Sequence, residues 1–388
     1  MELPIFSSEP SGIFRKIYMH IPFCIRKCPY CAFYSETAPS KEDMERYLKA
    51  LEREMAWWGD RLESPLRAST LYVGGGTPTL LDPDLWKKFF AALDGHVFFE
   101  KASEITVEAN PGSLKEEHLR LWKEWGVSRI SLGVQGFSEE DLRTLGRPHD
   151  AEQAEDAVQR ALELGFDVTL DLMFGLPRQA LREWHASLRK AVHLGISHLS
   201  LYHLTLEPGT PWGESPPENL PEGYSFYRWA QHYLGRKGFS QYEVASFARP
   251  GKEARHNLAY WRQEDVLGLG AGAWGYWKGL RYGHVSSVRD YLRAFENPSS
   301  AEAFERSLNY TEFLSPEKRA AEGAVLLLRT RWGIPLKAFR RRFGDAIARG
   351  VLAKLAPFMP DLAEYREGHL RLTPRGMRVA NQIWSELL

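Results

Sequence analysis

Short apolar runs alternate with amphipathic stretches through the first two hundred residues. Six runs predict buried strands, at Lys16–Ile21, Thr70–Val73, Glu104–Glu108, Arg129–Val134, Asp167–Met173 and His198–His203. Between them, apolar residues recur every three or four positions, which predicts helices at Lys41–Trp58, Pro83–Leu93, Leu114–Trp125, Ala151–Leu164 and Leu181–Leu194. Each helix is long enough to return the next strand parallel. The pattern therefore predicts an α/β fold of six βα units, with a parallel sheet curled into a partial (β/α)6 barrel.

The pattern changes after about residue 309. Helices are expected at Pro316–Leu328, Pro335–Phe343 and Asp345–Leu355, followed by a short strand pair near His369–Leu372 and a helix over Pro374–Leu387. This order predicts a small helical module of winged-helix type. We divide the chain into an extension (residues 1–15), a core barrel (16–240), a flanking segment (241–308) and the C-terminal helical domain (309–388).

Charge adds a weak asymmetry to this division. The whole chain has 50 basic and 50 acidic residues, whereas residues 315–388 carry a net charge of +7. A basic run, Arg340–Arg342, within a helix-turn-helix-like pattern is one signal of nucleic-acid binding. A solvated basic face on a small helical cap explains it more simply, so no nucleic-acid partner is predicted.

Three cysteines, Cys24, Cys28 and Cys31, are the only ones in the chain, and they fall within eight positions. Soft thiolates gathered in one loop suit zinc or an iron–sulfur cluster. Closed zinc sites need four ligands, for which His20 is the nearest candidate, whereas a 4Fe-4S cluster held by three cysteines leaves one iron open. Three thiols with no even disulfide framework also indicate a reducing compartment.

The ends of the chain give no sign of a membrane span or an export signal. No run approaches the roughly 20 apolar residues that a spanning helix requires. The first ten residues lack the basic and apolar regions of a secretory leader. The sequence therefore predicts a cytoplasmic protein.

Chemically active side chains follow the predicted strands. The cysteine loop follows the first strand and Gly74-Gly75-Gly76-Thr77-Pro78 follows the second, without the Gly-Lys-Ser/Thr of a Walker loop. Polar residues lie at or near later strand ends: Glu108, Gln135, Arg147 and Asp171. In βα barrels such positions gather on one face. Carboxylates accept hydrogen bonds from hydroxyls or an ammonium group, and arginine binds a carboxylate, so the set suits a zwitterionic ligand that carries a ribose.

Several motifs together resemble one family. The Cys-x3-Cys-x2-Cys spacing is similar to the cluster motif of radical S-adenosylmethionine (SAM) proteins. With Gly74-Gly-Gly-Thr-Pro-Thr79, Glu108-Ala-Asn-Pro111, Gly146-Arg-Pro-His149, His256-Asn-Leu-Ala-Tyr-Trp261 and Leu372-Thr-Pro-Arg-Gly376, it resembles the oxygen-independent coproporphyrinogen III oxidase family over nearly the whole chain. Within that family the chain looks most like the HemW-type heme chaperones.

The resemblance implies a TIM-like radical SAM barrel and three cofactors: a 4Fe-4S cluster, SAM and heme. Cluster ligation would fall on Cys24, Cys28 and Cys31. Contacts to SAM would fall on Tyr18, Gly75, Gly76, Thr77, Glu108, Gln135, Arg147 and Asp171. It also implies a heme-acceptor protein as partner and allows peripheral attachment to a membrane. The sequence indicates neither the acceptor nor the electron donor, and no catalytic residue is assigned.

Heme contacts are expected on a second motif, at His256, Asn257, Tyr260 and Trp261. In a helix over residues 252–262, His256 and Tyr260 are four positions apart and share one face. The neutral imidazole of His256 would then ligate the heme iron with the aromatic ring of Tyr260 beside it. Spacing alone favours the simpler interpretation, in which aromatic residues at helical spacing pack a core. The family resemblance favours heme.

Two activities stay open within the family. A heme chaperone would bind heme and deliver it, whereas the oxidase would decarboxylate coproporphyrinogen III to protoporphyrinogen IX with a SAM-derived radical. By this resemblance, the oxidases have the cysteine motif Cys-x3-Cys-x2-Cys-x-Cys and a longer N-terminal extension. This chain reads Cys31-Ala32-Phe33, without the fourth cysteine, and begins its first strand near residue 16. Ala32 also stands where HemW-like proteins usually have Asp. We favour the chaperone, without oxidase activity; a zinc-stapled binding protein is a third interpretation.

Overall fold

The structure is a computed structural model that describes residues 15–297, 300 and 302–388. The predicted extension, apart from Arg15, lies outside the described residues. The described residues divide into two compact units: those within 15–25, 34–105 and 265–312 form the first, and those within 26–33, 106–264 and 313–388 form the second. Each unit is described separately.

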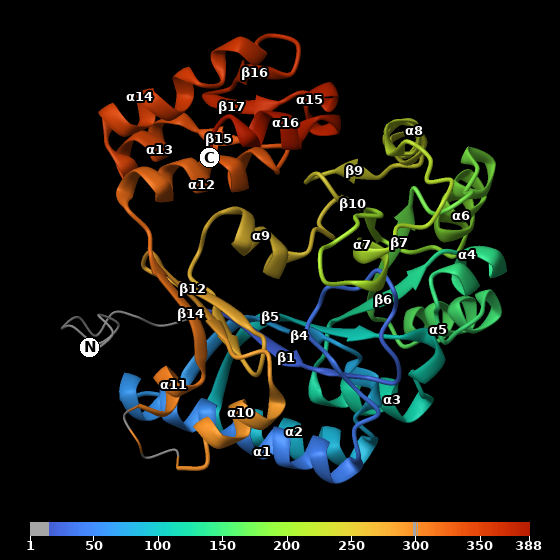
Figure 1. Ribbon diagram of the computed structural model, residues 1–388, viewed down its shortest axis with the longest axis vertical. Helices are drawn as coiled ribbons and strands as arrows, with labels where there is room; N and C mark the ends of the chain where they lie inside the picture. The colour runs from blue at the N-terminus through green and yellow to red at the C-terminus, as the bar shows by residue number, and fades with distance from the viewer. Residues whose placement is uncertain (1–14, 298–299, 301) are drawn as a thin grey trace. The chain divides into compact units, whose positions relative to one another are not determined.

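Parallel strands form the centre of the first unit (Figure 1). Strand β1 (Lys16–Ile21) pairs with β4 (Leu66–Gly75) on one side and with β11 (Leu267–Leu269) on the other. Helix α1 (Lys41–Leu62) begins at a capping box between Ser40 and Asp43, and α2 (Pro83–His96) begins at the Asp82 cap. Both helices bury tryptophans, which anchor them in the core.

Strand β11 was not predicted, because the sequence Leu-Gly-Leu in a glycine-rich run carries too little apolar pattern to indicate a strand. The structure shows why glycine is needed there. A Cβ on Gly268 would lie 2.1 Å from the Trp274 carbonyl oxygen, so only a residue without a side chain fits. The backbone of this run is therefore packed closely, as part of a sheet.

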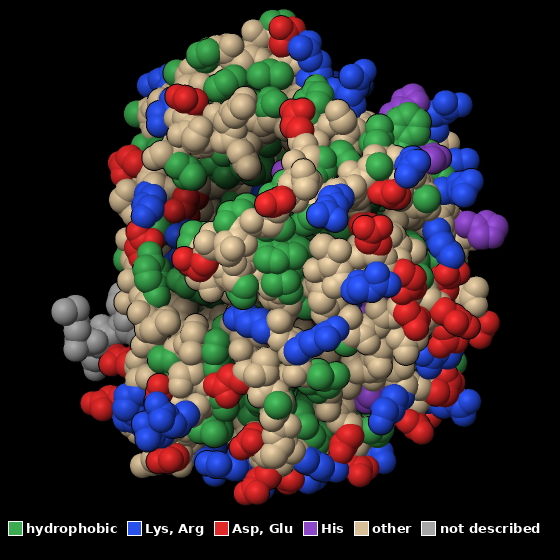
Figure 2. Space-filling view, turned by 45° about the vertical axis from the view of Figure 1, so that its right-hand side comes forward, with side chains coloured by type: hydrophobic (Ala, Val, Ile, Leu, Met, Phe, Trp, Pro, Cys, Tyr) green, Lys and Arg blue, Asp and Glu red, His purple; other side chains and the backbone are tan. Residues whose placement is uncertain are grey.

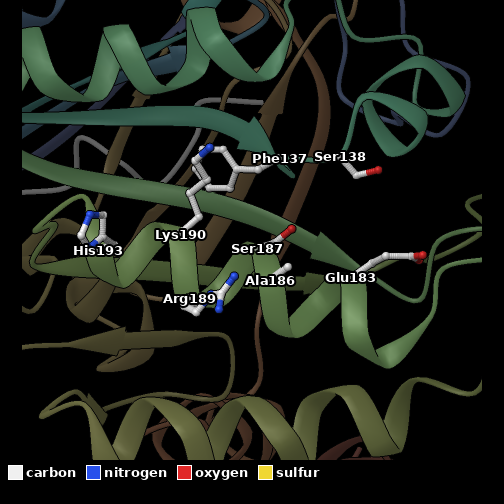
Figure 3. Close-up of a pocket in the computed structure, with 8 residues that line it drawn as sticks. All are labelled: Phe137, Ser138, Glu183, Ala186, Ser187, Arg189, Lys190 and His193. Atoms are coloured by element: carbon white, nitrogen blue, oxygen red, sulfur yellow. The ribbon is translucent and has the colours of Figure 1, made fainter.

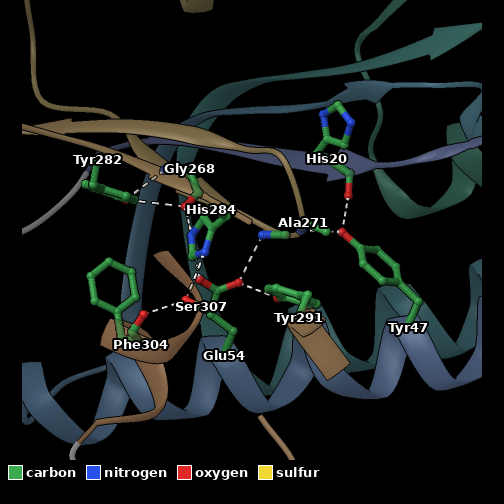
Figure 4. A network of polar contacts seen from close by, with 11 residues as sticks. His20, Tyr47, Glu54, Gly268, Ala271, Tyr282, His284, Tyr291, Phe304 and Ser307 are labelled. Carbon is green, nitrogen blue, oxygen red and sulfur yellow. Dashed lines mark hydrogen bonds and ion pairs between the residues drawn. The ribbon is translucent and has the colours of Figure 1, made fainter. Parts of the chain in front are cut away.

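Smaller elements complete the first unit. They are the parallel pair β2 (Phe23–Cys24) and β3 (Glu36–Thr37), the antiparallel sheet of β12 (Trp274–Trp277), β13 (Leu280–His284) and β14 (Leu308–Phe313), and helices α10 (Val288–Ala294) and α11 (Ala303–Arg306). A buried polar network centred on Glu54 and His284 joins α1 to β13 and to the residues after β11 (Figure 4).

The second unit continues the βα pattern. The last residues of β5 (Val97–Ala109) pair in parallel with β6 (Arg129–Gln135), which pairs with β7 (Asp167–Phe174), and β7 with β8 (His198–His203). Strand β10 (Ser246–Ala248) is antiparallel to both β8 and β9 (Ser240–Gln241). The helices are α3 (Glu116–Trp125), α4 (Glu139–Thr144), α5 (Ala151–Glu163), α6 (Leu181–His193), α7 (Pro211–Glu214), α8 (Gly223–Arg236) and α9 (Arg255–Trp261).

The six predicted strands and five predicted helices are therefore all confirmed, with ends that differ by up to seven residues, the largest difference being at the start of β5. Helix α5 shows why the periodic pattern located these elements. Its buried residues Ala154, Ala157, Val158 and Ala161 follow the spacing of one helical face. The antiparallel pair β9 and β10 was missed, since two- and three-residue strands leave no periodic signal.

The C-terminal elements belong to the second unit. Helices α12 (Pro316–Leu328), α13 (Leu336–Phe343) and α14 (Asp345–Ala353) surround a common apolar core with the antiparallel strands β15 (Ile334–Pro335), β17 (His369–Leu372) and β16 (Ala363–Arg366), as Figure 1 shows. The winged-helix order of elements is as expected.

The single helix predicted over Pro374–Leu387 is wrong: the structure has α15 (Pro374–Arg378) and α16 (Ala380–Ser385) instead. Val379 interrupts them with φ −122° and ψ 25°, and its amide donates to the Gly376 carbonyl, which closes the first helix. The sequence gives no warning, because a valine is tolerated inside most helices.

The surface mixes charges of both signs. In Figure 2, Lys and Arg side chains are interspersed with Asp and Glu over the face shown, in keeping with the equal counts in the sequence. In the part of the chain that the structure describes, no helix has the length and apolar character to cross a membrane.

Candidate cofactor site

Tyr18 is held by a chain of hydrogen bonds within the first unit. Its hydroxyl lies 2.8 Å from Nδ1 of His20, whose Nε2 lies 3.0 Å from the Tyr34 carbonyl oxygen. Burial lowers the pKa of His20 to about 4, so the ring is neutral at pH 7. Because a carbonyl only accepts, Nε2 carries the proton and Nδ1 accepts from the Tyr18 hydroxyl. The orientation of Tyr18 is thereby fixed.

The glycine run after β4 lies tightly against the end of β1. Gly75 has φ +116°, and a Cβ on Gly76 would lie 2.5 Å from the Phe23 carbonyl oxygen. The amide of Thr77 donates to that same carbonyl (2.7 Å), and its Oγ1 donates to Sγ of Cys24 (3.6 Å). The glycines are thus needed to bring this loop against the first cysteine, a reason that sequence alone did not provide.

The other two cysteines belong to the second unit. The Cys31 amide donates to the Cys28 carbonyl, which turns the loop, and the three cysteines form no disulfide and are half-buried. Arg147 Nη1 donates to Sγ of Cys28 (3.7 Å), and Nη2 donates to the Gly133 carbonyl (2.7 Å). In the described part of the chain, no group of three or more Cys, His, Asp or Glu side chains is arranged to hold a single metal ion.

Arg147 also has an unsatisfied donor. Its Nε is buried and has no hydrogen-bond partner among the described residues. A buried donor without a partner is costly unless a ligand accepts from it. An arginine held by a carbonyl on one side and bonded to a thiol on the other fits a site for an anionic group such as a carboxylate.

Two carboxylates lie on neighbouring strands of the same unit. Glu108 is opposite Ser131 in the register of β5 and β6, and the Ser131 hydroxyl donates to Asp171 on β7 (3.1 Å). Burial, together with the negative charge of Glu108, raises the pKa of Asp171 to about 7. The pair therefore holds less than two full negative charges at neutral pH, which suits hydrogen bonding to hydroxyls.

Gln135 ends β6 in the left-handed region, with φ +68°. The register of β6 with β7 shifts between Leu132 and Gln135, so the strand end is irregular. A non-glycine residue in this conformation is strained, and such strain can be part of a functional site. Gln135 shares it with eight other described residues, so its position at the strand end, beside the other predicted site residues, is what makes it a candidate.

Sequence reasoning missed a residue pair behind these side chains. His149 Nδ1 lies 3.1 Å from Oδ1 of Asn110, and its Nε2 lies 3.1 Å from the Val134 carbonyl oxygen. Burial and the charge of Arg147 lower the pKa of His149 to about 4. The pair connects the loops that carry Glu108, Gln135 and Arg147. The sequence did carry a signal for this pair, since both residues lie within the family motifs quoted above, although neither was assigned a role there.

The predicted heme residues lie on α9, in the second unit. His256 and Tyr260 share one face as expected, with His256 Nε2 3.3 Å from the Tyr260 hydroxyl and the two rings edge to face. His256 is only 1% exposed, and burial raises the pKa of Tyr260 above its ordinary value. Iron ligation by His256 therefore requires a shift of α9.

Trp261 ends α9 and packs partly buried against Tyr242, Ala248 and Leu258, and the guanidinium of Arg329 lies 4.2 Å from the centre of its ring. Asn257 is half-buried one position after the histidine. Trp261 thus serves the packing between α9 and the C-terminal elements, which is the core role that spacing alone favoured.

A cavity of about 440 Å³ lies elsewhere in this unit, between α6 and the residues that follow β6 (Figure 3). Phe137 and Ser138 line one side, and Lys190 and His193 come from α6. None of the predicted site residues lines this cavity.

Comparison with known proteins defines the class. Residues 18–191 match the family model for the Radical SAM superfamily, and residues 314–379 match the HemN C-terminal domain. The structure titled "Coproporphyrinogen III oxidase (HemN) from Escherichia coli is a Radical SAM enzyme" aligns with a TM-score of 0.84 at 22% identity, over 98% of this chain and 91% of that one. The predicted partial (β/α)6 radical SAM barrel with a C-terminal helical domain is confirmed.

Sequence relatives define the branch. Heme chaperone HemW of Bacillus subtilis is 34% identical over 96% of this chain and 99% of its own length, and that of Lactococcus lactis is 30% identical over 96% of both. The Escherichia coli HemW is 34% identical over 88% of this chain and 92% of its own. The chain therefore belongs to the HemW heme chaperone family. Membership of the radical SAM superfamily implies a 4Fe-4S cluster and SAM.

Proposed function

We propose that this protein binds a 4Fe-4S cluster, SAM and heme, and that it delivers the heme to an acceptor protein in the cytoplasm. The single observation that carries this proposal is the similarity to HemW chaperones over almost the full length of both chains. The fold likeness to the oxidase does not separate the two activities, since it shows the fold alone. The absence of a further cysteine after Cys31-Ala32-Phe33 favours the chaperone.

Cys24, Cys28 and Cys31 would hold the cluster. Three cysteines outside any disulfide provide the thiolate ligands that iron–sulfur clusters need and leave one iron for another ligand. When bound, the cluster supplies an electron for the reductive cleavage of SAM. Thr77 and Arg147 support the assignment, because each donates to a cysteine sulfur and such hydrogen bonds tune a cluster.

SAM would contact the residues that follow the strands. The carboxylate group of SAM suits Arg147, whose buried Nε has no partner among the described residues. The ribose hydroxyls suit Glu108 and Asp171, and Gln135 and Tyr18 present oriented polar groups. Gly75, Gly76 and Thr77 would bring backbone amides and carbonyls close to the ligand. Each is proposed as a binding residue, and none is assigned a catalytic step.

Heme would bind at α9, with His256 as iron ligand and Asn257, Tyr260 and Trp261 beside it. The neighbouring Tyr260 hydroxyl fixes the direction of the imidazole, as an outer hydrogen bond does for a metal-ligating histidine. The burial of His256 predicts slow binding, because α9 must move first.

The cluster assignment is tested by anaerobic reconstitution with iron and sulfide, followed by electron paramagnetic resonance with and without SAM. We expect a 4Fe-4S signal that changes when SAM is added, and an Arg147→Lys variant that keeps the cluster but binds SAM more weakly. Zinc in place of iron in the protein purified without oxygen, or a spectrum that ignores SAM, contradicts the assignment.

Hemin titration followed by absorbance tests the heme assignment. His256→Ala is expected to weaken binding, whereas His198→Ala serves as a matched control. His198 is also fully buried in the same unit and also lies against a tyrosine, with its Nε2 2.8 Å from the Tyr242 hydroxyl. Equal losses in the two variants would show a general packing effect. Conversion of coproporphyrinogen to protoporphyrinogen in the presence of SAM and a reductant would favour the oxidase.

A further inference from the structure

A groove of about 830 Å³ lies in the second unit between α8, the β9–β10 pair and α15. Its volume is within the range of small-molecule sites, roughly 300–1,000 Å³. None of the residues predicted to bind the cluster, SAM or heme lines it. Trp229, Phe239 and Phe247 provide apolar walls, and Arg228, His232 and Arg378 provide polar groups.

Two arginines, Arg228 and Arg378, line this groove, and Arg375 lies near enough to Tyr224 to act on it electrostatically. Arg378 donates to the amide oxygen of Gln231 (2.6 Å) and to the Tyr224 hydroxyl (3.5 Å). The hydrogen bond from Arg378, with the positive charges of Arg378, Arg228 and Arg375, holds the pKa of Tyr224 below its ordinary value. None of these arginines forms an ion pair with a carboxylate among the described residues. Surface arginines gathered in this way attract anions such as carboxylates and phosphates.

An aromatic wall adjoins the arginines. Trp229 is half-buried, and its Nε1 donates to Nδ1 of His185 (3.0 Å), which fixes the indole. His232 lies on the same helix with its ring 5.9 Å from that of Trp229. His232 is exposed, and neither ring nitrogen forms a hydrogen bond to a described residue.

His232 and His256 differ in their access to a ligand from solvent. His256 is buried against Tyr260, whereas His232 presents a free imidazole to solvent, one helical turn from Arg228 and beside a fixed indole. An imidazole for iron, an aromatic wall for a flat macrocycle and guanidinium groups for two carboxylates are the groups that recognise an iron porphyrin.

We propose that this groove is an accessible second heme site, in which His232 ligates the iron and Arg228 and Arg378 bind the propionates. The inference rests on the proposed heme-binding function. It gives heme a contact that requires no movement of α9, so the groove would be occupied before the buried His256.

The test uses hemin titration of the full chain, with absorbance as readout. In a His256→Ala background, hemin binding should persist and should weaken at least tenfold when His232→Ala is added. His193→Ala is the matched control, because His193 is an exposed histidine on α6 outside the groove. Arg228→Gln with Arg378→Gln should weaken hemin by roughly tenfold or more, a loss of one or two charge-assisted contacts. The same pair should leave hemin dimethyl ester, whose carboxylates are blocked, unaffected.

Each outcome is decisive. If His256→Ala alone abolishes hemin binding, the groove site is overturned while heme binding at α9 stands. If His232→Ala acts no more strongly than His193→Ala, the groove site is overturned as well. If the arginine variants weaken hemin and its dimethyl ester equally, the assignment of the propionates is overturned. If the unmodified protein binds no hemin, the proposed function fails and the groove site with it.

Discussion

Replacing Glu54 tests whether the buried network of the first unit holds α1 to the strands behind it. Glu54 and His284 are both fully buried, with Glu54 Oε1 3.1 Å from His284 Nε2. Oε2 of Glu54 accepts from the Gly270 amide (3.0 Å) and from the Tyr291 hydroxyl. His284 Nδ1 lies 3.0 Å from Oγ of Ser307 (Figure 4). Oε2 of Glu54 thus accepts two hydrogen bonds, whereas Oε1 lies within ion-pair distance of His284 without a hydrogen bond.

The expected loss in the free energy of unfolding follows from the buried groups that Glu54→Ala leaves without their partner. Hydrogen bonds to a charged group contribute about 1.5–3 kcal/mol each, and removal of one partner of a buried ion pair costs about 3–5 kcal/mol. Because these contributions overlap, we expect Glu54→Ala to lower the free energy of unfolding by about 3–5 kcal/mol. Glu54→Gln keeps the volume and one acceptor, so it should lose less, about 1–3 kcal/mol.

Urea denaturation followed by circular dichroism measures the loss through the shift of the midpoint. Glu52→Ala is the matched control, since Glu52 lies on the same helix, is about half exposed and reaches His96 only at 4.0 Å. An exposed pair of this kind is worth about 0–1 kcal/mol. If Glu54→Ala were no more destabilising than Glu52→Ala, the network would not hold the unit together and the reasoning would be refuted.

Three further predictions concern the glycine loop, a titrating carboxylate and the C-terminal helices. Gly76→Ala should destabilise the protein by about 1–3 kcal/mol and weaken SAM binding, because the new Cβ would clash with the backbone of Phe23. Gly95→Ala should have neither effect, since nothing lies within 4 Å of a Cβ at that position. Calorimetry measures the stability and the SAM binding of the two variants, and equal effects would contradict the prediction. Because the pKa of Asp171 is raised, the folded state keeps a proton between about pH 4 and 7 that the unfolded state has lost. The stability of the protein relative to Asp171→Asn should therefore fall across that pH window and be level above pH 7. A difference in urea midpoint that is constant with pH would refute this prediction. Arg329→Met leaves the buried Glu243 carboxylate, 3.3 Å away, without its cation, and should cost about 3 kcal/mol, measured as a lower urea midpoint; an unchanged midpoint would show that Arg329 is not needed there.

The placement of the site residues shows where the sequence analysis reached its limit. Cys28 and Arg147 were both selected from their motifs, but their contact joins positions 119 residues apart and could not be read from local pattern. His149 and Asn110 were quoted within motifs and given no role, because a hydrogen bond across 39 positions has no local signature. His256 was predicted on the correct helical face, but its burial depends on packing that is formed elsewhere in the chain.

By itself, the sequence determined the six strands and five helices of the βα series and the cysteine loop, and its motifs carried the resemblance to the family. Periodicity and cysteine spacing are local properties, so local propensity and thiolate chemistry are enough to read the elements and the loop. Only the tertiary structure decided that Leu267–Leu269 is a strand beside β1, that Val379 divides the last helix, and that Arg228 and Arg378 meet at the groove beside α8. These features depend on which distant segments pack together, and burial and counter-charge are properties of the folded neighbourhood rather than of any stretch of chain.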